Sequence, residues 1–289
     1  MNVGLIGNGY WGKIYIKTLS EMTDVNLVAV HTHDYQKMLS RNDIDCVIIA
    51  TPAETHFKII KDCLIAKKHV LVEKPFITDS TKAIELAETD LILMVGHTYL
   101  HHEGIKKLKE LIDSGTLGSI ERVYSHRLSC SKHPNALWEM GAHDLYILDY
   151  FFDKYVNEEV SAMGNISHCI FNTRYKKVLY EPFLKEHIIN AYVEVSNYCY
   201  QGNKIREIII EGTKKRVVFD DEAKIKIHTT DNKTKAVEVI KLKDDVTPLE
   251  KQCRHFFDCI TNCDKPISGI SDGFKNILSL EHLENLLKL

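Results

Sequence analysis

Three side chains in this sequence have the chemistry to take part in proton transfer. Lys74 lies in the triplet Glu73-Lys74-Pro75, where the proline restricts the lysine to an extended backbone and so fixes its direction. Glu139 and His143 are four residues apart, so a helix would place them on one face. A carboxylate beside an imidazole raises the imidazole pKa and orients the ring, which suits proton transfer near neutral pH. The plainer interpretations are a solvated lysine at a strand end and an ordinary Glu–His pair on a helix surface.

A glycine-rich turn near the amino end could hold the phosphates of a dinucleotide. The run Gly7-Asn8-Gly9-Tyr10-Trp11-Gly12 follows a short apolar segment and precedes an amphipathic one, so the order is strand, tight turn, helix. Gly7 permits the turn, Gly9 leaves room for a pyrophosphate, and Gly12 lets the helix and strand pack closely. The helix N-terminus then offers unpaired N–H groups and a partial positive charge. The same pattern also occurs as a plain turn in other α/β proteins.

Strands alternate with helices in the first part of the chain. We expect strands at residues 2–6, 25–30, 45–50, 69–72 and 91–95. This alternation predicts a doubly wound parallel sheet, in which ligands bind at the carboxyl ends of the strands. We therefore expect the cofactor crevice to be lined by residues that follow the third and fourth strands, namely Thr51, Pro52, His56, Glu73 and Lys74.

The pattern changes after Gly118. A strand at 120–128 and a helix at 135–152 precede a strand-rich stretch that runs to residue 242, and two helices close the chain. Successive strands joined by short turns favour an antiparallel sheet. We therefore predict an α/β chain with a Rossmann domain at 1–118 and a second, α+β domain at 119–289, built on a mostly antiparallel open sheet.

Composition narrows the possible partners. The net charge of −3 and the hydrophobic fraction of 44% suit an ordinary globular protein and suggest neither a nucleic acid nor a membrane partner. No apolar run approaches the roughly 20 residues that span a bilayer. Because the first residues already read as a strand, we expect no signal peptide and a cytoplasmic location.

The cysteines suggest neither a redox motif nor a metal site. There are eight, without a Cys-x-x-Cys pair, and in a cytoplasmic protein we expect such thiols to be reduced and buried. The densest group is Cys253, His255, Cys259 and Cys263. Its spacing matches no common structural zinc site, so we expect a plain helical face and no metal.

Taken together, these motifs resemble the Gfo/Idh/MocA family of NAD(P)-dependent oxidoreductases over nearly the whole chain. The matching segments are Gly7–Gly12, Ala50-Thr51-Pro52 with Thr55-His56, Glu73-Lys74-Pro75, Val95-Gly96-His97, Leu111–Gly118, Trp138–Asp144 and Cys253–Ile260. The resemblance implies a Rossmann domain that binds the dinucleotide, and a substrate held between it and the second domain. It also implies that the family's lysine is Lys74, with a peptide bond to the proline that is often cis.

The resemblance further implies a hydride transfer between nicotinamide and a hydroxyl-bearing carbon of a sugar, a nucleotide sugar or a cyclitol. The family's Asp-x-x-x-His pair falls on Glu139 and His143, with Glu where Asp is usual. His143 would shuttle the hydroxyl proton and Lys74 would orient and polarise the C–O bond. Trp138, in the Leu137-Trp138 approach to the pair, favours the nucleotide-sugar branch, and Tyr99 and Trp138 are candidate substrate contacts.

The choice of dinucleotide depends on the end of the second strand. NAD enzymes usually carry an acidic residue there, but Thr32 occupies that position. His33, Lys37 and Arg41 follow and could accommodate a 2′-phosphate. Asp34 could still reach a ribose if the turn is short. The sequence favours NADP over NAD, and both stay open.

Several further residues lead to separate expectations. His101 and His102 are adjacent and cannot share a helix face, so at least one should face solvent. Arg127 should form a cross-strand ion pair, and Lys214-Lys215-Arg216 should be a solvated turn. The open sheet should be covered in a homo-oligomer, since an exposed apolar sheet aggregates.

Two other functions stay open. One is a redox-silent regulator or assembly protein that binds a dinucleotide, and the substitution at Glu139 is compatible with it. The other is a hydrolase or epimerase that oxidises and re-reduces its substrate with a tightly bound nicotinamide. Net turnover of the dinucleotide separates a dehydrogenase from both.

Overall fold

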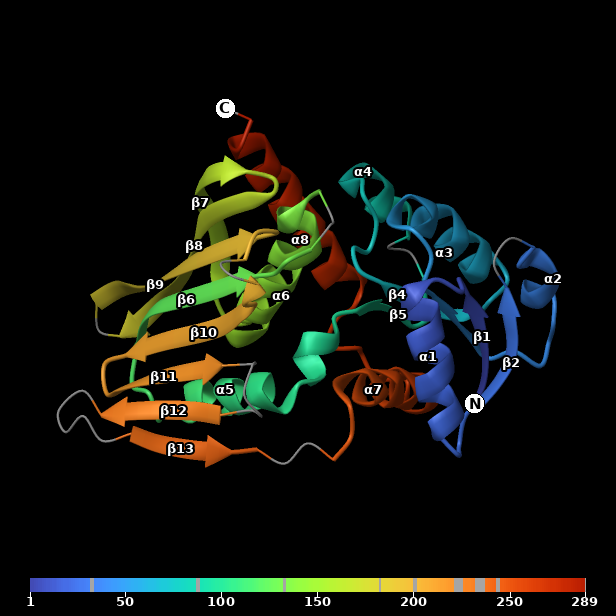
Figure 1. Cartoon of the computed structure of the whole chain (residues 1–289), viewed down its shortest axis with the longest axis horizontal. Helices are drawn as coiled ribbons and strands as arrows, with labels where there is room; N and C mark the ends of the chain where they lie inside the picture. The colour runs from blue at the N-terminus through green and yellow to red at the C-terminus, as the bar shows by residue number, and fades with distance from the viewer. Residues whose placement is uncertain are drawn as a thin grey trace. The chain divides into compact units, whose positions relative to one another are not determined.

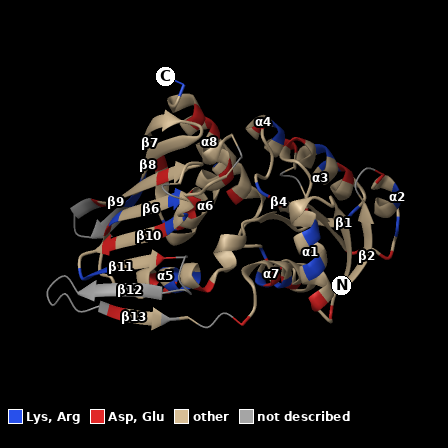
Figure 2. Cartoon of the chain, viewed as in Figure 1, with Lys and Arg blue, Asp and Glu red and all other residues tan. Residues whose placement is uncertain are grey.

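The computed structural model describes residues 1–31, 34–86, 89–131, 134–181, 183–199, 202–220, 226–231, 237–242 and 245–288. The chain forms two compact units (Figure 1). The first unit contains Met1–His101 and Val246–Leu278, and the second contains His102–Asp245 and Ser279–Leu289. Acidic and basic residues are interspersed along the elements of each unit (Figure 2).

These units differ from the expected 1–118 and 119–289 in two ways. Helix α5 (Glu103–Asp113) belongs to the second unit, and Val246–Leu278, which contains helix α7 (Pro248–Asn262) and the first part of the helix after it, returns to the first. The reason for the return is packing, because Cys253 and Phe256 of α7 belong to the same buried cluster as Leu5 of the first sheet.

The sheet of the first unit has five parallel strands, as predicted. Its order is β2-β1-β3-β4-β5. The strands are β1 (Asn2–Ile6), β2 (Asn26–His31), β3 (Cys46–Ile49), β4 (His69–Glu73) and β5 (Leu93–Gly96). All four residues of β3 are buried, which agrees with a central strand covered on both faces.

Helices cover both faces of this sheet. Helix α1 (Tyr10–Glu21) and α7 pack on one face, where Tyr15 and Leu19 join the cluster of buried residues. Helix α3 (His56–Ile65) buries Ile59, Ile60 and Cys63 and connects β3 to β4. The shorter pieces are α2 (Gln36–Leu39), α4 (Ser80–Ala83) and the 3-10 turns η1 (Ala53–Thr55), η2 (Ile84–Leu86) and η3 (Thr98–His101). The helix expected at 80–87 is therefore one α-turn followed by a 3-10 turn.

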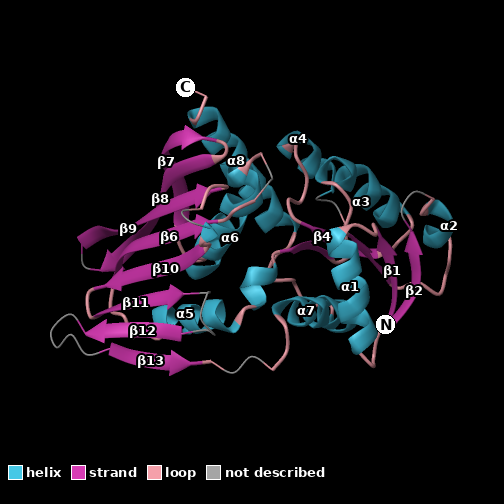
Figure 3. Ribbon diagram, viewed as in Figure 1, coloured by secondary structure: helices cyan, strands magenta, loops and turns pink. Residues whose placement is uncertain are grey.

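The second unit contains an eight-stranded sheet of order β13-β12-β11-β10-β6-β9-β8-β7 (Figure 3). The strands are β6 (Ile120–Leu128), β7 (Val156–Asn165), β8 (His168–Glu181), β9 (Phe183–Ser196), β10 (Ile205–Gly212), β11 (Lys215–Asp220), β12 (Lys226–Asp231) and β13 (Val237–Lys241). The pair β6–β9 is parallel, and the other six pairs are antiparallel. The prediction of a mostly antiparallel second sheet is confirmed.

One face of this sheet packs against helices. Buried residues alternate with more open ones along β8 and β9, where Phe171 and Val193 are among the buried residues. A side chain at Gly104 of α5 would collide with Phe219, and one at Gly141 would meet Phe171, so both glycines permit close packing. The remaining helical elements are the π-turn η4 (Leu137–Gly141), α6 (Ala142–Phe151) and α8 (Ile270–Leu286). Among the described residues, the helices are too short or too polar to cross a bilayer.

Candidate active site

The glycine turn after β1 has the backbone that the sequence predicts. Gly7 has φ of +109°, and a Cβ there would run into the carbonyl of Ala50 at the end of the neighbouring strand. A Cβ at Gly12 would run into the carbonyl of Gly7. By contrast, a Cβ at Gly9 would meet no atom within 4 Å. Gly7 and Gly12 are therefore required for packing, and Gly9 keeps open space in front of the turn.

This open space lies at the N-terminus of α1. Gly9 is the N-cap, no side chain caps the helix, and the first turn carries no acidic residue. Asn8, Gly9, Tyr10 and Trp11 are exposed. Unpaired helical N–H groups facing such a cradle favour an anion, so these residues fit the pyrophosphate of a dinucleotide.

The turn also occupies the correct edge of the sheet. The Gly7 amide donates to the His31 carbonyl at 2.8 Å, and the Ala50 amide donates to the Ile6 carbonyl at 2.8 Å. The turn thus joins the carboxyl ends of β1, β2 and β3. Strand β1 has β2 on one side and β3 on the other, which is the switch point where open α/β sheets bind ligands.

The predicted residues Thr51, Pro52 and His56 lie in the connection that follows β3. His56 is buried, and its Nε2 lies 2.9 Å from the Thr51 carbonyl while its Nδ1 lies 2.9 Å from the Pro75 carbonyl. Burial lowers the pKa of His56 despite these carbonyl contacts. His56 therefore ties the loop after β3 to the loop that carries Lys74. Its role as a cofactor contact stays a prediction.

Lys74 follows β4 directly and is half-buried. The Lys74–Pro75 peptide bond is cis, which confirms that expectation. Glu73 is buried, with Tyr15 donating to its Oε1 at 2.7 Å and the Lys74 amide donating to its Oε2 at 3.2 Å. Burial raises the pKa of Glu73 to about 6, while the Tyr15 hydrogen bond and the Lys74 charge oppose that rise. Glu73 thus uses both carboxylate oxygens within the protein.

His97 lies at the end of the neighbouring strand β5 and is buried. Burial and the positive charge of Lys74 hold the pKa of His97 well below its usual range. Lys74, Glu73 and His97 therefore form one electrostatic group at the carboxyl ends of β4 and β5.

Two residues predicted to select the dinucleotide, Thr32 and His33, lie outside the described residues. Asp34, which follows them, lies 3.1 Å from Lys37 in an exposed ion pair. The choice between NAD and NADP stays open.

In the second unit, Glu139 lies in a π-turn and not in the regular α-helix that the sequence suggested. The Ala142 amide bonds to the Leu137 carbonyl, a step of five residues in place of four. His143 is the second residue of the α-helix that follows. Inserted π-turns of this kind occur frequently at functional sites.

The π-turn still presents the predicted residues together. Trp138, Glu139 and His143 are half-buried, whereas the neighbouring Leu137 and Met140 are buried. Ser131 donates to Glu139 Oε2 at 3.0 Å. The three predicted residues therefore share the more open side of this segment.

The residue after His143 has a structural role that the sequence did not predict. Asp144 is buried and accepts from Arg127 Nε at 2.9 Å and from Ser125 Oγ at 2.7 Å. The expected cross-strand partner for Arg127 is therefore wrong, because the pair joins a strand to a helix. This pair fixes the backbone on the C-terminal side of His143.

The expectation for the adjacent histidines is also wrong. His101 and His102 are both buried. They avoid sharing a face because His101 ends η3, whereas the His102 ring caps α5 by accepting from the Gly104 amide at 3.1 Å. Tyr99, a predicted substrate contact, is half-buried in η3.

Two cysteines are not reduced, contrary to expectation. Cys130 and Cys199 form a disulfide with Cα atoms 5.2 Å apart. They follow β6 and β9, which pair in parallel up to Leu128 and Ser196. The six others are free, and of these Cys263 is exposed. In the part of the chain that the structure describes, no group of His, Cys, Asp and Glu residues has a metal-binding arrangement.

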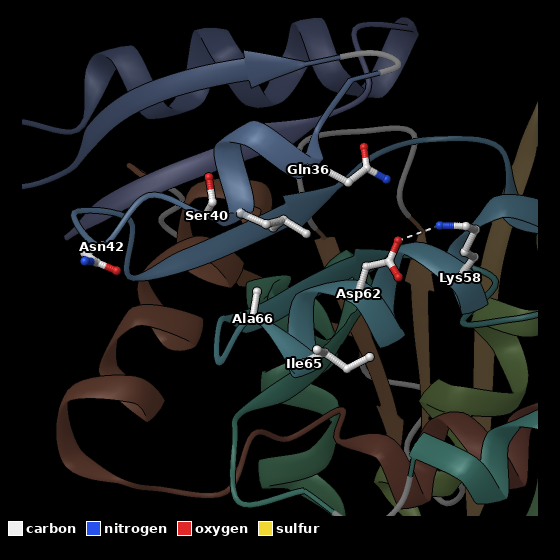
Figure 4. Close-up of a pocket in the computed structure, with 8 residues that line it drawn as sticks. Gln36, Ser40, Asn42, Lys58, Asp62, Ile65 and Ala66 are labelled. Carbon is white, nitrogen blue, oxygen red and sulfur yellow. Dashed lines mark hydrogen bonds and ion pairs between the residues drawn. The ribbon is translucent and has the colours of Figure 1, made fainter.

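A cavity of about 630 Å³ lies between α2 and α3 of the first unit (Figure 4). Its lining residues are Gln36, Leu39, Ser40, Asn42, Lys58, Asp62, Ile65 and Ala66. Lys58 donates to Asp62 at 2.6 Å, and Tyr35 donates to the same oxygen at 2.7 Å. Because the charged groups satisfy one another and no predicted catalytic residue lines this cavity, we place the candidate site at the glycine turn and Lys74.

The sequence of the first unit matches a known family model. Residues 26–97 match the GFO_IDH_MocA model, described as an oxidoreductase family with an NAD-binding Rossmann fold. The chain is 38% identical over 90 residues to a dTDP-3,4-didehydro-2,6-dideoxy-alpha-D-glucose 3-reductase of Actinomadura kijaniata, covering 30% of this chain and 27% of that protein. It is 27% identical over 197 residues to a myo-inositol 2-dehydrogenase of Thermotoga maritima, covering 57% and 59%. These matches thus span about a quarter and about three fifths of the two curated relatives.

Solved structures share the fold over the whole chain. A UDP-N-acetylglucosamine 3-dehydrogenase of Acidithiobacillus ferrooxidans aligns with a TM-score of 0.81 at 17% identity, covering 100% of this chain and 97% of that one. A scyllo-inositol dehydrogenase of Lactobacillus casei aligns with a TM-score of 0.77 at 17% identity, covering 100% and 96%. The predicted resemblance is confirmed: this chain is a relative of the Gfo/Idh/MocA oxidoreductases, and its residues 26–97 carry their NAD-binding Rossmann fold.

Proposed function

We propose that this protein is an NAD(P)-dependent oxidoreductase acting on a hydroxyl-bearing carbon of a sugar, a nucleotide sugar or a cyclitol. One observation carries the proposal: the open, uncapped N-terminus of α1 and the lysine after β4 belong to the same carboxyl edge of one parallel sheet. The named activities of the relatives support this class of substrate. A nicotinamide dinucleotide, when bound, supplies the hydride acceptor or donor.

In this proposal the residues of the chain divide the remaining work. The amides after Gly9 bind the pyrophosphate. Lys74 donates a hydrogen bond to the substrate oxygen and polarises the C–O bond. His143 accepts the hydroxyl proton during oxidation and returns it during reduction, and the Glu139 carboxylate favours the charged imidazole.

The finer choices are part of the same proposal. Trp138 beside Glu139 favours a nucleotide sugar among the three substrate classes. Lys37 and Arg41 near the end of β2 favour NADP over NAD. A cytoplasmic location also stays a prediction.

We further propose that the protein is a homo-oligomer assembled through the second sheet. The face opposite its helices carries partly exposed apolar residues, among them Ile170, which is 46% exposed. Tyr124 and Tyr192 stack on that face with ring centroids 5.4 Å apart. Light scattering should give a molar mass larger than that of a single chain, and Tyr192→Glu should reduce it to the mass of a single chain.

The test of the activity uses the two tryptophans, Trp11 in the glycine turn and Trp138 in the π-turn. In Trp138→Phe, quenching of Trp11 fluorescence reports dinucleotide binding alone. Wild-type protein is then screened with sugars, nucleotide sugars and inositols, and the absorbance of reduced nicotinamide is followed. Binding with substrate-dependent absorbance change supports the proposal. Binding without net change for any substrate would leave the redox-silent or transient-oxidation functions.

A further inference from the structure

A chain of buried hydrogen bonds ends on the residue before Lys74. Thr98 donates to Gln252 Oε1 at 3.0 Å, and Gln252 Nε2 donates to the Tyr15 hydroxyl at 2.9 Å. Tyr15 in turn donates to Glu73 Oε1 at 2.7 Å. Tyr15 and Gln252 are 0% exposed and Glu73 is 4% exposed, so water does not compete for the Gln252–Tyr15 and Tyr15–Glu73 bonds, whereas the bond from the half-buried Thr98 is only partly buried.

The directions of these hydrogen bonds indicate which protonation state of Glu73 they stabilise. An amide nitrogen can only donate, so the Tyr15 hydroxyl accepts a hydrogen bond from Gln252 and donates its single hydrogen to Glu73. The Lys74 amide also can only donate, and it meets the other oxygen, Oε2, at 3.2 Å. Both oxygens of Glu73 thus receive hydrogens, and neither faces an acceptor among these partners. This arrangement fits an ionised carboxylate and not a protonated one.

Titratable groups on neighbouring elements respond to the charges of Glu73 and Lys74. On α7, burial and the negative charge of Glu73 raise the pKa of the Cys253 thiol above its usual range. At the end of β5, burial and the positive charge of Lys74 keep His97 neutral by lowering its pKa. Tyr15 on α1 is held protonated by burial and by Glu73, which raise its pKa. The charge of Lys74 in turn acts against the rise in the pKa of Glu73, so the ammonium and the carboxylate interact electrostatically.

We propose that Glu73 is the buried counter-ion of Lys74, and that Tyr15 and Gln252 are positioning residues that hold its carboxylate and so keep the Lys74 ammonium charged. The proposal rests on the proposed function only in assigning catalytic value to Lys74. The interaction between Glu73 and Lys74 is a property of the folded first unit and does not require substrate. Because burial raises the pKa of Glu73 to about 6, the counter-ion is present above that pH and lost below it.

The experiment measures the charge of Lys74 directly. Trace acetylation with acetic anhydride labels only the neutral amine, and mass spectrometry of peptides reads each lysine across a pH series. In Glu73→Gln, loss of a nearby opposite charge should make Lys74 label about tenfold faster than in wild type at pH 8. The exposed residues Lys13 and Lys17 of α1 serve as internal references. Tyr15→Phe, which removes one donor to the carboxylate, should give a smaller increase in the same direction.

The matched control is Glu85→Gln. Glu85 pairs with Lys61 at 2.8 Å on the surface, and its loss should leave Lys74 labelling unchanged. Unchanged Lys74 labelling in folded Glu73→Gln would overturn the proposal. If that variant does not fold, the test uses wild-type protein. The labelling rate of Lys74, plotted against pH, should then show a second inflection near pH 6. A curve with a single titration step would overturn the proposal. Full activity in Lys74→Ala would refute the proposed function while leaving this result intact.

Discussion

Arg127 and Asp144 form a buried ion pair, with Nε and Oδ2 2.9 Å apart. It joins the C-terminal end of β6 to the first turn of α6, next to His143. Because Ser125 donates to the same carboxylate, Asp144 is held by two partners from one strand. The backbone of His143, which we propose transfers a proton, is thus held in place by the neighbouring Asp144. Asp144 does not contact the substrate in our proposal.

Removing Asp144 should therefore damage the fold as well as the site. Asp144→Ala leaves the Arg127 guanidinium buried without its partner, and such losses cost about 3–5 kcal/mol. Chemical denaturation should measure this drop in unfolding free energy. Asp43→Ala, which breaks an exposed pair with Arg41, is the control and should not change stability. Equal stability of the two variants would contradict the structural role of Asp144.

Lys74→Ala should lower turnover by at least about a hundredfold, as expected when a positioned polarising group is lost. Dinucleotide binding, followed through Trp11 fluorescence, should persist. Lys13→Ala, an exposed lysine on α1, is the matched control and should retain full turnover. Wild-type turnover in Lys74→Ala would refute the assignment.

His143→Ala and the double variant with Lys74→Ala extend this test. If both side chains act on the same hydroxyl, the losses should be far from additive, because one group has little left to act on without the other. Steady-state turnover of both single variants and the double variant completes the cycle. Strictly additive losses would indicate independent roles.

Two glycines of the turn should respond in opposite ways. A side chain at Gly9 meets no atom, so Gly9→Val should fold normally but bind dinucleotide at least about tenfold more weakly, because the branched side chain fills the phosphate cradle. Gly7→Val should lose stability, since Gly7 has φ of +109° and its Cβ would strike a backbone carbonyl. Thermal melting and fluorescence titration separate the two effects. Tight binding by Gly9→Val would place the pyrophosphate elsewhere.

Stability should depend on pH through Glu73. Its pKa is raised from 4.5 to about 6 in the folded protein, so the folded state holds the proton more tightly than the unfolded chain. That contribution is fully present below about pH 4.5 and is lost as the pH rises through 6, amounting to about 2 kcal/mol. Glu73→Gln should therefore gain stability relative to wild type between pH 4 and 7. A constant difference across this range would contradict the raised pKa.

The disulfide should be visible by mass. Unreduced protein should be about 2 Da lighter than reduced protein, and a peptide should link Cys130 to Cys199. The bridge closes a separation of 69 residues, and Cys130→Ser should cost about 2–4 kcal/mol of unfolding free energy. Cys263→Ser, at an exposed free thiol, is the control. Two free thiols at positions 130 and 199 in native protein would show that the bridge does not form.

Local patterns were sufficient to predict the first sheet and the placement of Lys74. Apolar runs, the glycine turn and the triplet ending in Pro75 are each contiguous, and their physical meaning depends on near neighbours. The same reasoning could not find the partners of Glu73. Gln252 reaches Tyr15 across 237 residues of sequence, and neither residue stands in a motif that suggests a hydrogen bond.

Other differences arise from tertiary packing. The π-turn η4 adds one residue to a helical turn, and the apolar periodicity of residues 135–152 does not reveal this addition. The sequence therefore predicted Glu139 and His143 as a pair on a regular α-helix. The sequence predicted that His101 and His102 could not both be buried. Both are buried because the His102 ring caps α5 by accepting from the Gly104 amide. Cys130 and Cys199 lack any spacing signal, because their pairing depends on two strands ending side by side.

The return of α7 to the first unit has a consequence for the order of synthesis. A ribosome completes all five parallel strands long before it reaches Pro248, so the apolar patch that includes Leu5, Ile48 and Leu71 lacks the cover of α7 while most of the second unit is synthesised. Gln252 arrives on the same helix, and until then the Tyr15 hydroxyl lacks its donor. The nucleotide-binding unit is therefore completed only near the end of synthesis, at Leu278, although its signature motif is translated first.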